Sequence, residues 1–446
     1  MPPLKSWLPI PPNSDFTLHN LPLGIITSRN SQSIRRPATR IGNHVLDLQA
    51  FSSSQGFSSL SSLTPSQLST FSSPTLNAFA KLGQPVHRAV RGYLQEVFRA
   101  EGKFAGVLEQ NEERREKCLL KLEDTKCHLM MDVGDYTDFF AGVHHARNAG
   151  TIFRGPENAL QPNYHHLPVG YHGRSSSIVI SGTPITRPHG QILLDPSAVP
   201  KMPIFAPTRK LDMELELGCF LCDGNELGQP IPVTQASEKI FGYVLLNDWS
   251  ARDIQNWEYV PLGPFNGKNF ASTVSGWVVL FDALEGFRCE GAAGGRGDDG
   301  EGEVLEYLRE DRKATALNLN LEIDLITPEG DREGTTIEKV NAKNLIWSFE
   351  QMLAHQSAGG CNMRTGDLLG SGTISGEGGR GNVGSLLEET WNGRDEVWLK
   401  GMEVRRWLAD GDEIVFRGWA GGEGEDGEGR VGFGECRGRV VSAVRR

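Results

Sequence analysis

Apolar and acidic residues alternate strictly along the stretch Leu211–Gly218. A period of two residues predicts a β-strand with one buried and one polar face. The residues expected to face a core are Met213, Leu215 and Leu217. The acids expected to share the other face are Asp212, Glu214 and Glu216. Acids two positions apart on a strand lie roughly 7 Å apart, close enough to share one divalent cation. The alternative is an edge strand whose acids simply face water.

A second pattern begins with the apolar run Ile240–Leu246, which predicts a buried strand ending near Asp248. A helix is expected next, from about Ala251 to Tyr259. On it, Arg252, Gln255 and Tyr259 recur at i, i+3 and i+7, so one helix face offers a cation, an amide and a phenol. This pattern also fits a polar surface helix with a salt bridge. A buried strand that leads directly into these charges, with Lys268 shortly after, favours a charged site.

The first part of the chain shows no comparable chemistry. Short strands are expected up to about residue 50, the clearest being Ile25–Thr27 and His44–Leu48. A helix with one apolar face follows Pro85. Residues 109–126 are charged and predict a helical connector. We therefore expect two domains, residues 1–128 and 129–446.

Composition narrows the class of protein. The chain has 446 residues, a net charge of −11 and 23% charged residues, so nucleic acid and anionic membranes are not expected partners. No apolar run reaches the ~20 residues needed to span a bilayer, and no apolar signal segment follows Met1. The seven cysteines are scattered, and the pair Cys219 and Cys222 lacks the further ligands of a zinc site. We expect reduced thiols and a cytoplasmic protein.

Several segments affect the choice of cofactor and fold. The run Gly370–Gly376 fails the dinucleotide-binding spacing and no phosphate-binding loop is present, so no nucleotide or redox cofactor is expected. Residues 386–389 are expected to form a strand. Residues 284–312 and 420–429 are insertions rich in glycine and acids, expected to be exposed, and no function is assigned to them.

Two adjacent histidines, His144 and His145, lie on a short helix expected after Asp138. Adjacent helical side chains point about 100° apart, so at most one of them can face a given site. A single histidine near an acid is also compatible with a purely structural hydrogen bond.

Together, several motifs in this order resemble the fumarylacetoacetase family: Asp135–Phe139, Pro168–Arg174, Asp212–Glu216, Asn247–Gln255, Gly263–Phe265, Gly267–Lys268 and Gly372–Gly376. The resemblance implies a mainly β (α+β) fold, with a small N-terminal SH3-like β-barrel and a C-terminal mixed β-sandwich roll that forms a homodimer. It implies hydrolysis of a carbon–carbon bond in a β-diketo acid, 4-fumarylacetoacetate, to fumarate and acetoacetate. This is the last step of phenylalanine and tyrosine breakdown.

The resemblance also implies roles for particular residues. The metal ligands fall on Asp138, Glu214, Glu216 and Asp248, with Asp212 as a neighbour, and a secondary magnesium site falls around Asp248, Lys268 and Ser272. Oxygen ligands suit Ca²⁺ or Mg²⁺, and also Mn²⁺. The catalytic base falls on His145, with Glu388 as its partner and His144 as a spectator. Donors to a developing oxyanion would be Arg252, Gln255 and Lys268. Substrate contacts fall on Arg154, Tyr171, Gln255, Tyr259 and Thr373, and on Phe140, which stands where the family has a tyrosine.

Two competing hypotheses remain at this level. One is a related metal-dependent decarboxylase or hydratase of small keto acids, against which the pairing of His145 with Glu388 argues. The other is a metal-binding protein whose active site has decayed, for which Phe140 is the sole support.

Overall fold

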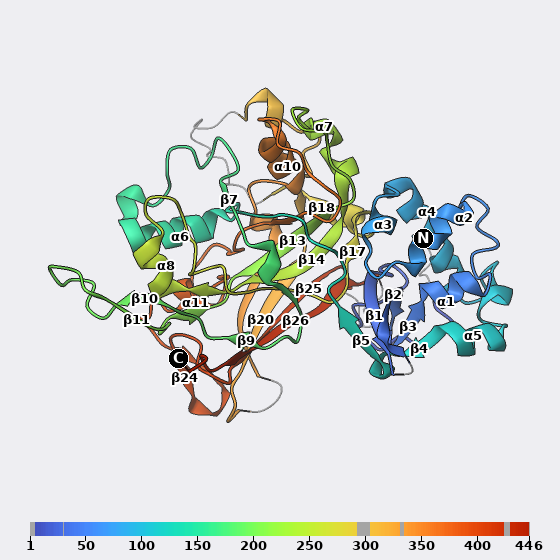
Figure 1. Ribbon diagram of the computed structural model, residues 1–446, viewed down its shortest axis with the longest axis horizontal. Coiled ribbons are helices and arrows are strands. Elements are labelled where there is room, and N and C mark those ends of the chain that lie inside the picture. Colours follow the sequence, from blue (N-terminus) through green and yellow to red (C-terminus); the bar gives the residue numbers. More distant parts are fainter. Residues whose placement is uncertain (1–4, 30, 292–303, 331–333, 423–428, 446) are drawn as a thin grey trace.

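The computed structural model describes residues 5–29, 31–291, 304–330, 334–422 and 429–445 (Figure 1). The predicted insertions therefore fall partly outside the described residues. In Figure 1 the N-terminal elements lie to one side of a larger strand-rich body. Within the described ranges, no helix is long and apolar enough to cross a membrane.

The N-terminal part is built on an antiparallel sheet of five described strands, in the order β4-β3-β2-β1-β5. The strands are β1 (Leu23–Ser28), β2 (Ser31–Ile41), β3 (His44–Asp47), β4 (Leu119–Lys121) and β5 (Thr125–His128). The helices are α1 (Leu48–Ser53), α2 (Pro65–Leu68), α3 (Asn77–Ala80), α4 (Gln84–Phe98) and α5 (Glu112–Cys118). The strands expected at 25–27 and 44–48 and the amphipathic helix after Pro85 are confirmed. The prediction of a helical connector over residues 109–126 is wrong in part, because helix α5 ends at Cys118 and strands β4 and β5 follow.

The described residues of the larger part form two main sheets. The first has the order β7-β6-β22-β13-β14-β16-β8, with β17 also pairing with β14. Its strands are β6 (Tyr136–Phe139), β7 (Gly170–His172), β8 (Ile178–Ile180), β13 (Leu215–Leu221), β14 (Ile240–Asp248), β16 (Ser272–Val274), β17 (Val279–Leu280) and β22 (Leu368–Gly370). The second has the order β21-β20-β25-β26-β9. Its strands are β9 (Ile185–Thr186), β20 (Asn320–Ile326), β21 (Thr335–Asn341), β25 (Glu413–Ala420) and β26 (Val431–Val441).

Shorter elements complete this part. Four two-stranded pairs are β10 (His189–Leu193) with β11 (Pro203–Pro207), β12 (Leu211–Asp212) with β15 (Ser250–Ala251), β18 (Arg288–Cys289) with β19 (Ala316–Leu317), and β23 (Val397–Trp398) with β24 (Val404–Arg405). The helices are α6 (Val143–Arg154), α7 (Val233–Ala236), α8 (Arg252–Glu258), α9 (Phe281–Leu284), α10 (Phe349–Ser357) and α11 (Leu386–Glu389). The fold is thus strand-rich, with helices packed around the sheets.

Strands β13 and β14 are buried on both faces. On one side, Leu217 and Leu245 belong to the main core of this part of the chain. On the other, Phe220 and Leu246 pack in a second core shared with the N-terminal helices. Because two layers cover these strands, any charge at their ends is also removed from water.

The acidic strand expected over 211–218 is interrupted. Asp212 lies in β12, which pairs with β15, whereas β13 begins only at Leu215; Glu214 makes an isolated bridge to Ser385. All three acids are buried, with Asp212 0%, Glu214 4% and Glu216 0% exposed. The alternative of a solvated edge strand is therefore wrong.

The strand expected at 386–389 is also wrong, because these residues form helix α11. The Ser385 side chain caps that helix by accepting a hydrogen bond from the Glu388 amide, a common way to begin a helix. Part of the insertion 284–312 is likewise folded: Leu308 is buried, and Glu310 accepts a hydrogen bond from the Ser348 hydroxyl at 2.8 Å.

Two acids, Glu338 of β21 and Glu389 of α11, lie close enough to interact. Glu338 accepts a hydrogen bond from the Val383 amide at 3.0 Å, and its other oxygen is buried with no hydrogen-bond partner among the described residues. Glu389 is its acidic neighbour, and it binds the Arg380 guanidinium and the Gly381 amide. Burial, together with the Glu389 charge, raises the pKa of Glu338 to about 10.

Glu338→Gln is expected to remove a pH-dependent loss of stability. In the unfolded chain Glu338 ionises at a pKa of about 4.3, whereas in the folded protein it stays protonated up to a pKa of about 10. The free energy of unfolding is therefore highest below a pH of about 4.3 and falls as pH rises toward 10. The glutamine amide resembles the protonated acid, so above neutral pH the variant should exceed the wild type by about 1–3 kcal/mol. Urea unfolding between pH 5 and pH 9 measures this difference. The control is Glu322→Gln on β20, which removes an ion pair with Lys339 of β21 and should leave the pH profile unchanged. Parallel profiles for Glu338→Gln and wild type would contradict the assignment.

Candidate metal centre and active site

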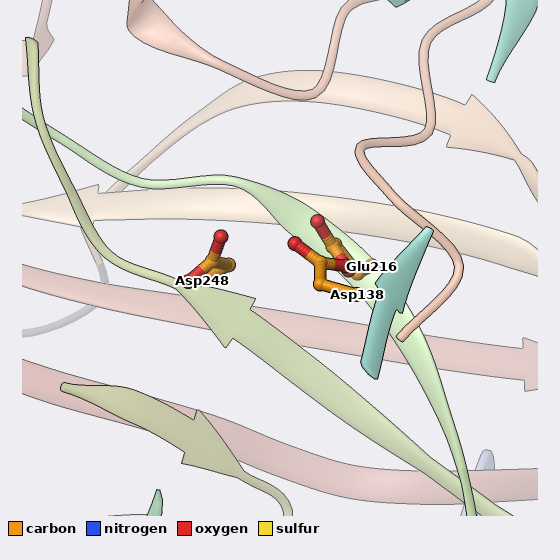
Figure 2. A group of neighbouring side chains, drawn as sticks. All are labelled: Asp138, Glu216 and Asp248. Atoms are coloured by element: carbon orange, nitrogen blue, oxygen red, sulfur yellow. The ribbon is translucent and has the colours of Figure 1, made fainter. Parts of the chain in front are cut away.

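Three carboxylates converge at the ends of separate strands of the first sheet: Asp138 of β6, Glu216 of β13 and Asp248 of β14. One oxygen from each lies within 4.8 Å of the others. Figure 2 shows these three side chains gathered together. The strand register explains the meeting, because Glu216 pairs with Leu246, two residues before Asp248 on the same face of β14.

Asp138 reaches this group through β22, which lies between β6 and β13. Asp138 pairs with Gly370, and Gly370 in turn lies across from Gly218. A Cβ atom at Gly370 would come within 2.6 Å of Asp138 Oδ1 and 3.0 Å of Glu216 Oε2. The glycine is therefore required here because the two carboxylates occupy the space of a side chain.

The three acids resist ionisation together. Burial and the nearby Asp248 charge hold the pKa of Asp138 well above its usual range, and burial and Asp138 do the same to Glu216. Burial also raises the pKa of Asp248, although Lys268 partly offsets this. A buried group of like charges becomes favourable when a cation binds among them.

The donor set fits such a cation. Asp138 Oδ1 and Glu216 Oε1 are buried and have no hydrogen-bond partner among the described residues. Buried polar atoms are normally paired, so these two oxygens are free to act as ligands. Oxygen-only ligation favours Mg²⁺, Ca²⁺ or Mn²⁺ over zinc.

Glu214 occupies a different position from the three converging acids. Its Oε1 accepts a hydrogen bond from Arg252 Nη2 at 2.7 Å, and its Oε2 contacts Lys268 Nζ. Burial opposes its charge, but Arg252 and Lys268 hold the pKa of Glu214 below its usual range. Lys268 also contacts Asp248 Oδ2 and is itself buried. Glu214 is therefore an ionised carboxylate between two cations, next to the other acids.

His145 pairs with a buried glutamate. Its Nδ1 lies 2.6 Å from Glu388 Oε2, and its Nε2 lies 3.6 Å from Glu214 Oε1. Burial alone would raise the pKa of Glu388, yet His145 and hydrogen bonds from Asn148 and Ser385 bring it below its usual value. An ionised Glu388 fixes the proton on Nδ1, which leaves Nε2 as the nitrogen that can accept one.

A cavity of about 420 Å³ joins these groups. The predicted site residues that line it are Asp138, Phe140, His145, Arg154, Tyr171, Glu214, Glu216, Arg252, Gln255, Tyr259, Lys268 and Thr373. The remaining three lie behind its wall. Glu388 supports His145, and Ser272 donates to Asp248 Oδ1 at 3.4 Å. The structure thus brings all the predicted site residues together.

Three hydrogen bonds to Glu388 were not predicted from the sequence. Glu388 accepts hydrogen bonds from Asn148 Nδ2 at 2.9 Å, Ser375 Oγ at 3.0 Å and Ser385 Oγ at 2.8 Å. Asn148 lies three residues after His145 on α6, so helical spacing could have indicated it. The two serines carry no local signal, because only the tertiary structure brings them to Glu388.

The buried carboxylate cluster could bind a metal ion, and it lies beside the His145–Glu388 pair at one cavity. This arrangement is typical of a metal-dependent enzyme. Two family models match the chain: "Fumarylacetoacetase N-terminal" over residues 19–130 and "Fumarylacetoacetate (FAA) hydrolase C-terminal" over residues 136–441. The chain belongs to the fumarylacetoacetase family.

Curated relatives agree with this assignment. The chain is 54% identical over 442 residues to a fumarylacetoacetase of Aspergillus fumigatus, covering 99% of each chain. It is 43% identical over 439 residues to the fumarylacetoacetase of Homo sapiens, covering 98% of this chain and 99% of that one. Among solved structures, a fumarylacetoacetate hydrolase from the psychrophile Exiguobacterium antarcticum matches with a TM-score of 0.50 and 14% identity, over 95% of this chain and 99% of that one. This last likeness concerns the fold alone.

Proposed function

We propose that the chain hydrolyses 4-fumarylacetoacetate to fumarate and acetoacetate, the last step of phenylalanine and tyrosine breakdown. The curated relatives named fumarylacetoacetase match over nearly their whole length. The observation that carries the proposal is that the His145–Glu388 pair and the three-carboxylate cluster open onto one cavity. In the reaction, one water adds its hydroxyl to the fumaryl carbonyl carbon. The bond from that carbon to the neighbouring CH₂ breaks, and this CH₂ gains a proton to become the methyl group of acetoacetate.

His145 is the proposed general base. Its Nε2 takes the proton of the attacking water, while Glu388 holds Nδ1 and stabilises the imidazolium that forms. Glu214, 3.6 Å from Nε2, is close enough to orient the same water.

The negative charge that develops on the substrate oxygen must be stabilised by hydrogen-bond donors. Arg252 Nη1 donates to Gln255 Oε1 at 3.2 Å, which places guanidinium and amide side by side on the cavity wall. With Lys268 they are the proposed donors to the oxyanion. Asp138, Glu216 and Asp248 would hold the proposed cation, which would supply Lewis-acid stabilisation of the diketone oxygens. Glu214 is the proposed fourth ligand, and it would have to release its contact with Arg252 or Lys268 to reach the ion. We propose Ca²⁺ or Mg²⁺ for this site, and a secondary magnesium site around Asp248, Lys268 and Ser272. There the Lys268 ammonium would be a neighbour of the ion and not a ligand, because it has no lone pair.

Substrate binding is assigned to the rest of the cavity wall. Arg154 is exposed at the cavity and supplies a positive charge for a carboxylate of the substrate. Tyr259 and Thr373 supply hydroxyl groups, and the hydroxyl of Tyr171 donates to Asp248 Oδ2 at 3.2 Å. The ring of Phe140 meets that of His145 edge to face, with centroids 5.4 Å apart. Phe140 therefore offers an apolar contact beside the base.

The proposal is tested with purified protein and fumarylacetoacetate. We expect loss of substrate absorbance with equal release of fumarate and acetoacetate, abolished by a chelator and restored by Mg²⁺ or Ca²⁺. If substrate persists under all of these conditions, the proposal is wrong. Carbon dioxide release from a small keto acid without fumarylacetoacetate cleavage would instead identify the related decarboxylase.

The finer description of the fold is also inferred. We assign an SH3-like barrel to the N-terminal sheet β1–β5 and the two layers of a sandwich roll to the two larger sheets. We also propose a domain boundary between residues 128 and 129. The two family models support a division near this point, because the first ends at residue 130 and the second begins at residue 136. The cytoplasm is the proposed compartment, which the seven free thiols support.

A homodimer is the proposed assembly. The hairpin β10–β11 extends away from the body in Figure 1 and carries large exposed apolar side chains: Leu194, Val199, Met202, Ile204 and Phe205. Grouped apolar side chains on a surface mark sites of association.

Phe205→Asp is expected to shift the protein from dimer to monomer in sedimentation velocity runs, because a charge would be buried at the interface. The control is Ile34→Asp, an exposed apolar position on β2, which should leave sedimentation unchanged. A monomeric wild type, or a Phe205→Asp variant that remains dimeric, would contradict the assembly.

A further inference from the structure

Asp212 is a buried acid that belongs neither to the carboxylate cluster nor to the cavity wall. The residue is 0% exposed and is not one of the three acids that converge within 4.8 Å of one another. A carboxylate placed so deeply is retained at considerable cost unless its partners compensate it.

Four donors surround this carboxylate. Oδ2 accepts from Arg252 Nε at 2.8 Å and from the Leu387 amide at 3.0 Å. Oδ1 accepts from the amides of Leu386 and Met213, each at 2.8 Å. Every partner is a donor, so all four contacts use the ionised form of the acid.

These contacts join two parts of the site that come from distant segments. Arg252 opens α8 and faces the cavity, whereas Leu386 and Leu387 begin α11. Helix α11 carries Glu388, which holds His145. One carboxylate therefore contacts both the guanidinium and the segment that supports the base.

The other two nitrogens of the Arg252 guanidinium bind residues of the cavity wall, not of α11. Its Nη2 donates to Glu214, and its Nη1 donates to Gln255. Both partners lie on the cavity wall, and Glu214 also contacts Lys268. Asp212 joins the guanidinium directly to the first backbone amides of α11, the helix on which Glu388 is located.

We propose that Asp212 is a positioning residue that fixes Arg252 relative to the His145–Glu388 pair. This inference rests on the proposed hydrolysis and deepens it. Asp212 does not touch the substrate; it sets the distance between the oxyanion donor and the general base. Such distances matter because misplacing a catalytic group by about 1 Å costs about 10²-fold in rate.

The test uses Asp212→Asn, which keeps the shape but removes the charge and one acceptor. We expect kcat for fumarylacetoacetate to fall about 10²-fold with KM changed less than about threefold. In an Arg252→Lys background the further loss caused by Asp212→Asn should shrink to less than about threefold, because its target is already altered. A crystal structure of Asp212→Asn, which needs no activity, should show Arg252 displaced relative to His145.

Asp412 offers a matched control. It is also 0% exposed, and it holds Arg405 through two contacts of 2.8 and 2.9 Å and the Ala409 amide at 2.8 Å, away from the cavity. Asp412→Asn should lower thermal stability as Asp212→Asn does but leave kcat unchanged.

Several results would overturn the assignment of Asp212. They are an Asp212→Asn variant with wild-type kcat, a full additive loss in the Arg252→Lys background, an equal loss of kcat in Asp412→Asn, or an unmoved Arg252 in the crystal structure. If Asp212→Asn does not fold, Asp212→Glu is the variant to measure, because it keeps the charge but moves the carboxylate. Wild-type kcat in Asp212→Glu would refute the inference. An inert wild type would refute the proposed hydrolysis instead, and the position of Arg252 would still decide the role of Asp212.

Discussion

Replacing His145 by alanine is expected to lower kcat by about 10²–10⁴-fold, the usual contribution of a general base. The pair with Glu388 leaves Nε2 as the open nitrogen on the cavity wall. No other histidine lines this cavity among the described residues. Because the base acts on water, KM for fumarylacetoacetate should change little. Steady-state kinetics at saturating metal would measure both constants.

The adjacent histidine provides a close control. His144 precedes His145 on α6 but does not line the cavity, and burial together with Arg147 lowers its pKa. His144→Ala alters helix propensity in the same way and should retain wild-type kcat. Equal losses in the two variants would show that α6 has been disturbed, and the base would have to be sought elsewhere.

Asp138→Asn should abolish activity while leaving the metal-free protein as stable as the wild type or more stable. Three buried carboxylates lie within 4.8 Å of one another, and burial with the Asp248 charge raises the pKa of Asp138. Removing one charge relieves this repulsion, but it also removes a ligand. Wild type should gain about 2.7 kcal/mol at a metal concentration 100-fold above Kd, and the variant should gain almost nothing. Denaturant unfolding with chelator and with Mg²⁺ or Ca²⁺ measures both effects.

The control is Glu350, a buried acid whose charge is balanced by two arginines, and neutralising it should lower stability. Glu350 accepts from Arg288 Nη2 at 2.7 Å and also contacts Arg312, far from the cluster in the chain. Glu350→Gln should cost about 3 kcal/mol, because breaking a buried ion pair leaves a charge unpaired. Its response to metal should equal that of the wild type. If Asp138→Asn is destabilised in the same way and still responds to metal, the cluster is not the metal site.

Much of the site could be expected from local patterns. The period-two pattern and the apolar run Ile240–Leu246 place acids at the ends of buried strands, and the structure confirms β13 and β14. Helical spacing places Arg252 beside Gln255, and α8 confirms this arrangement. These features depend on neighbours in the chain, so the sequence contains the information.

Other features depend on distant segments. The stretch 386–389 has no helical period long enough to recognise, and it becomes helical because Ser385 caps it and Asp212 accepts its first amides. Likewise, no local signal could show that Ser375 would contact Glu388.

By itself, the sequence determined which residue types were available: acids at alternating strand positions, a histidine pair on a helix, and cations soon after a buried strand. The tertiary structure alone decided which of these acids form the carboxylate cluster and which contact other groups. Asp138, Glu216 and Asp248 converge because β22 brings β6 beside β13, Glu214 is held between Arg252 and Lys268, and Asp212 turns toward α11. The physical reason is that strand period fixes which face a side chain occupies, whereas long-range pairing and charge compensation fix what it meets there.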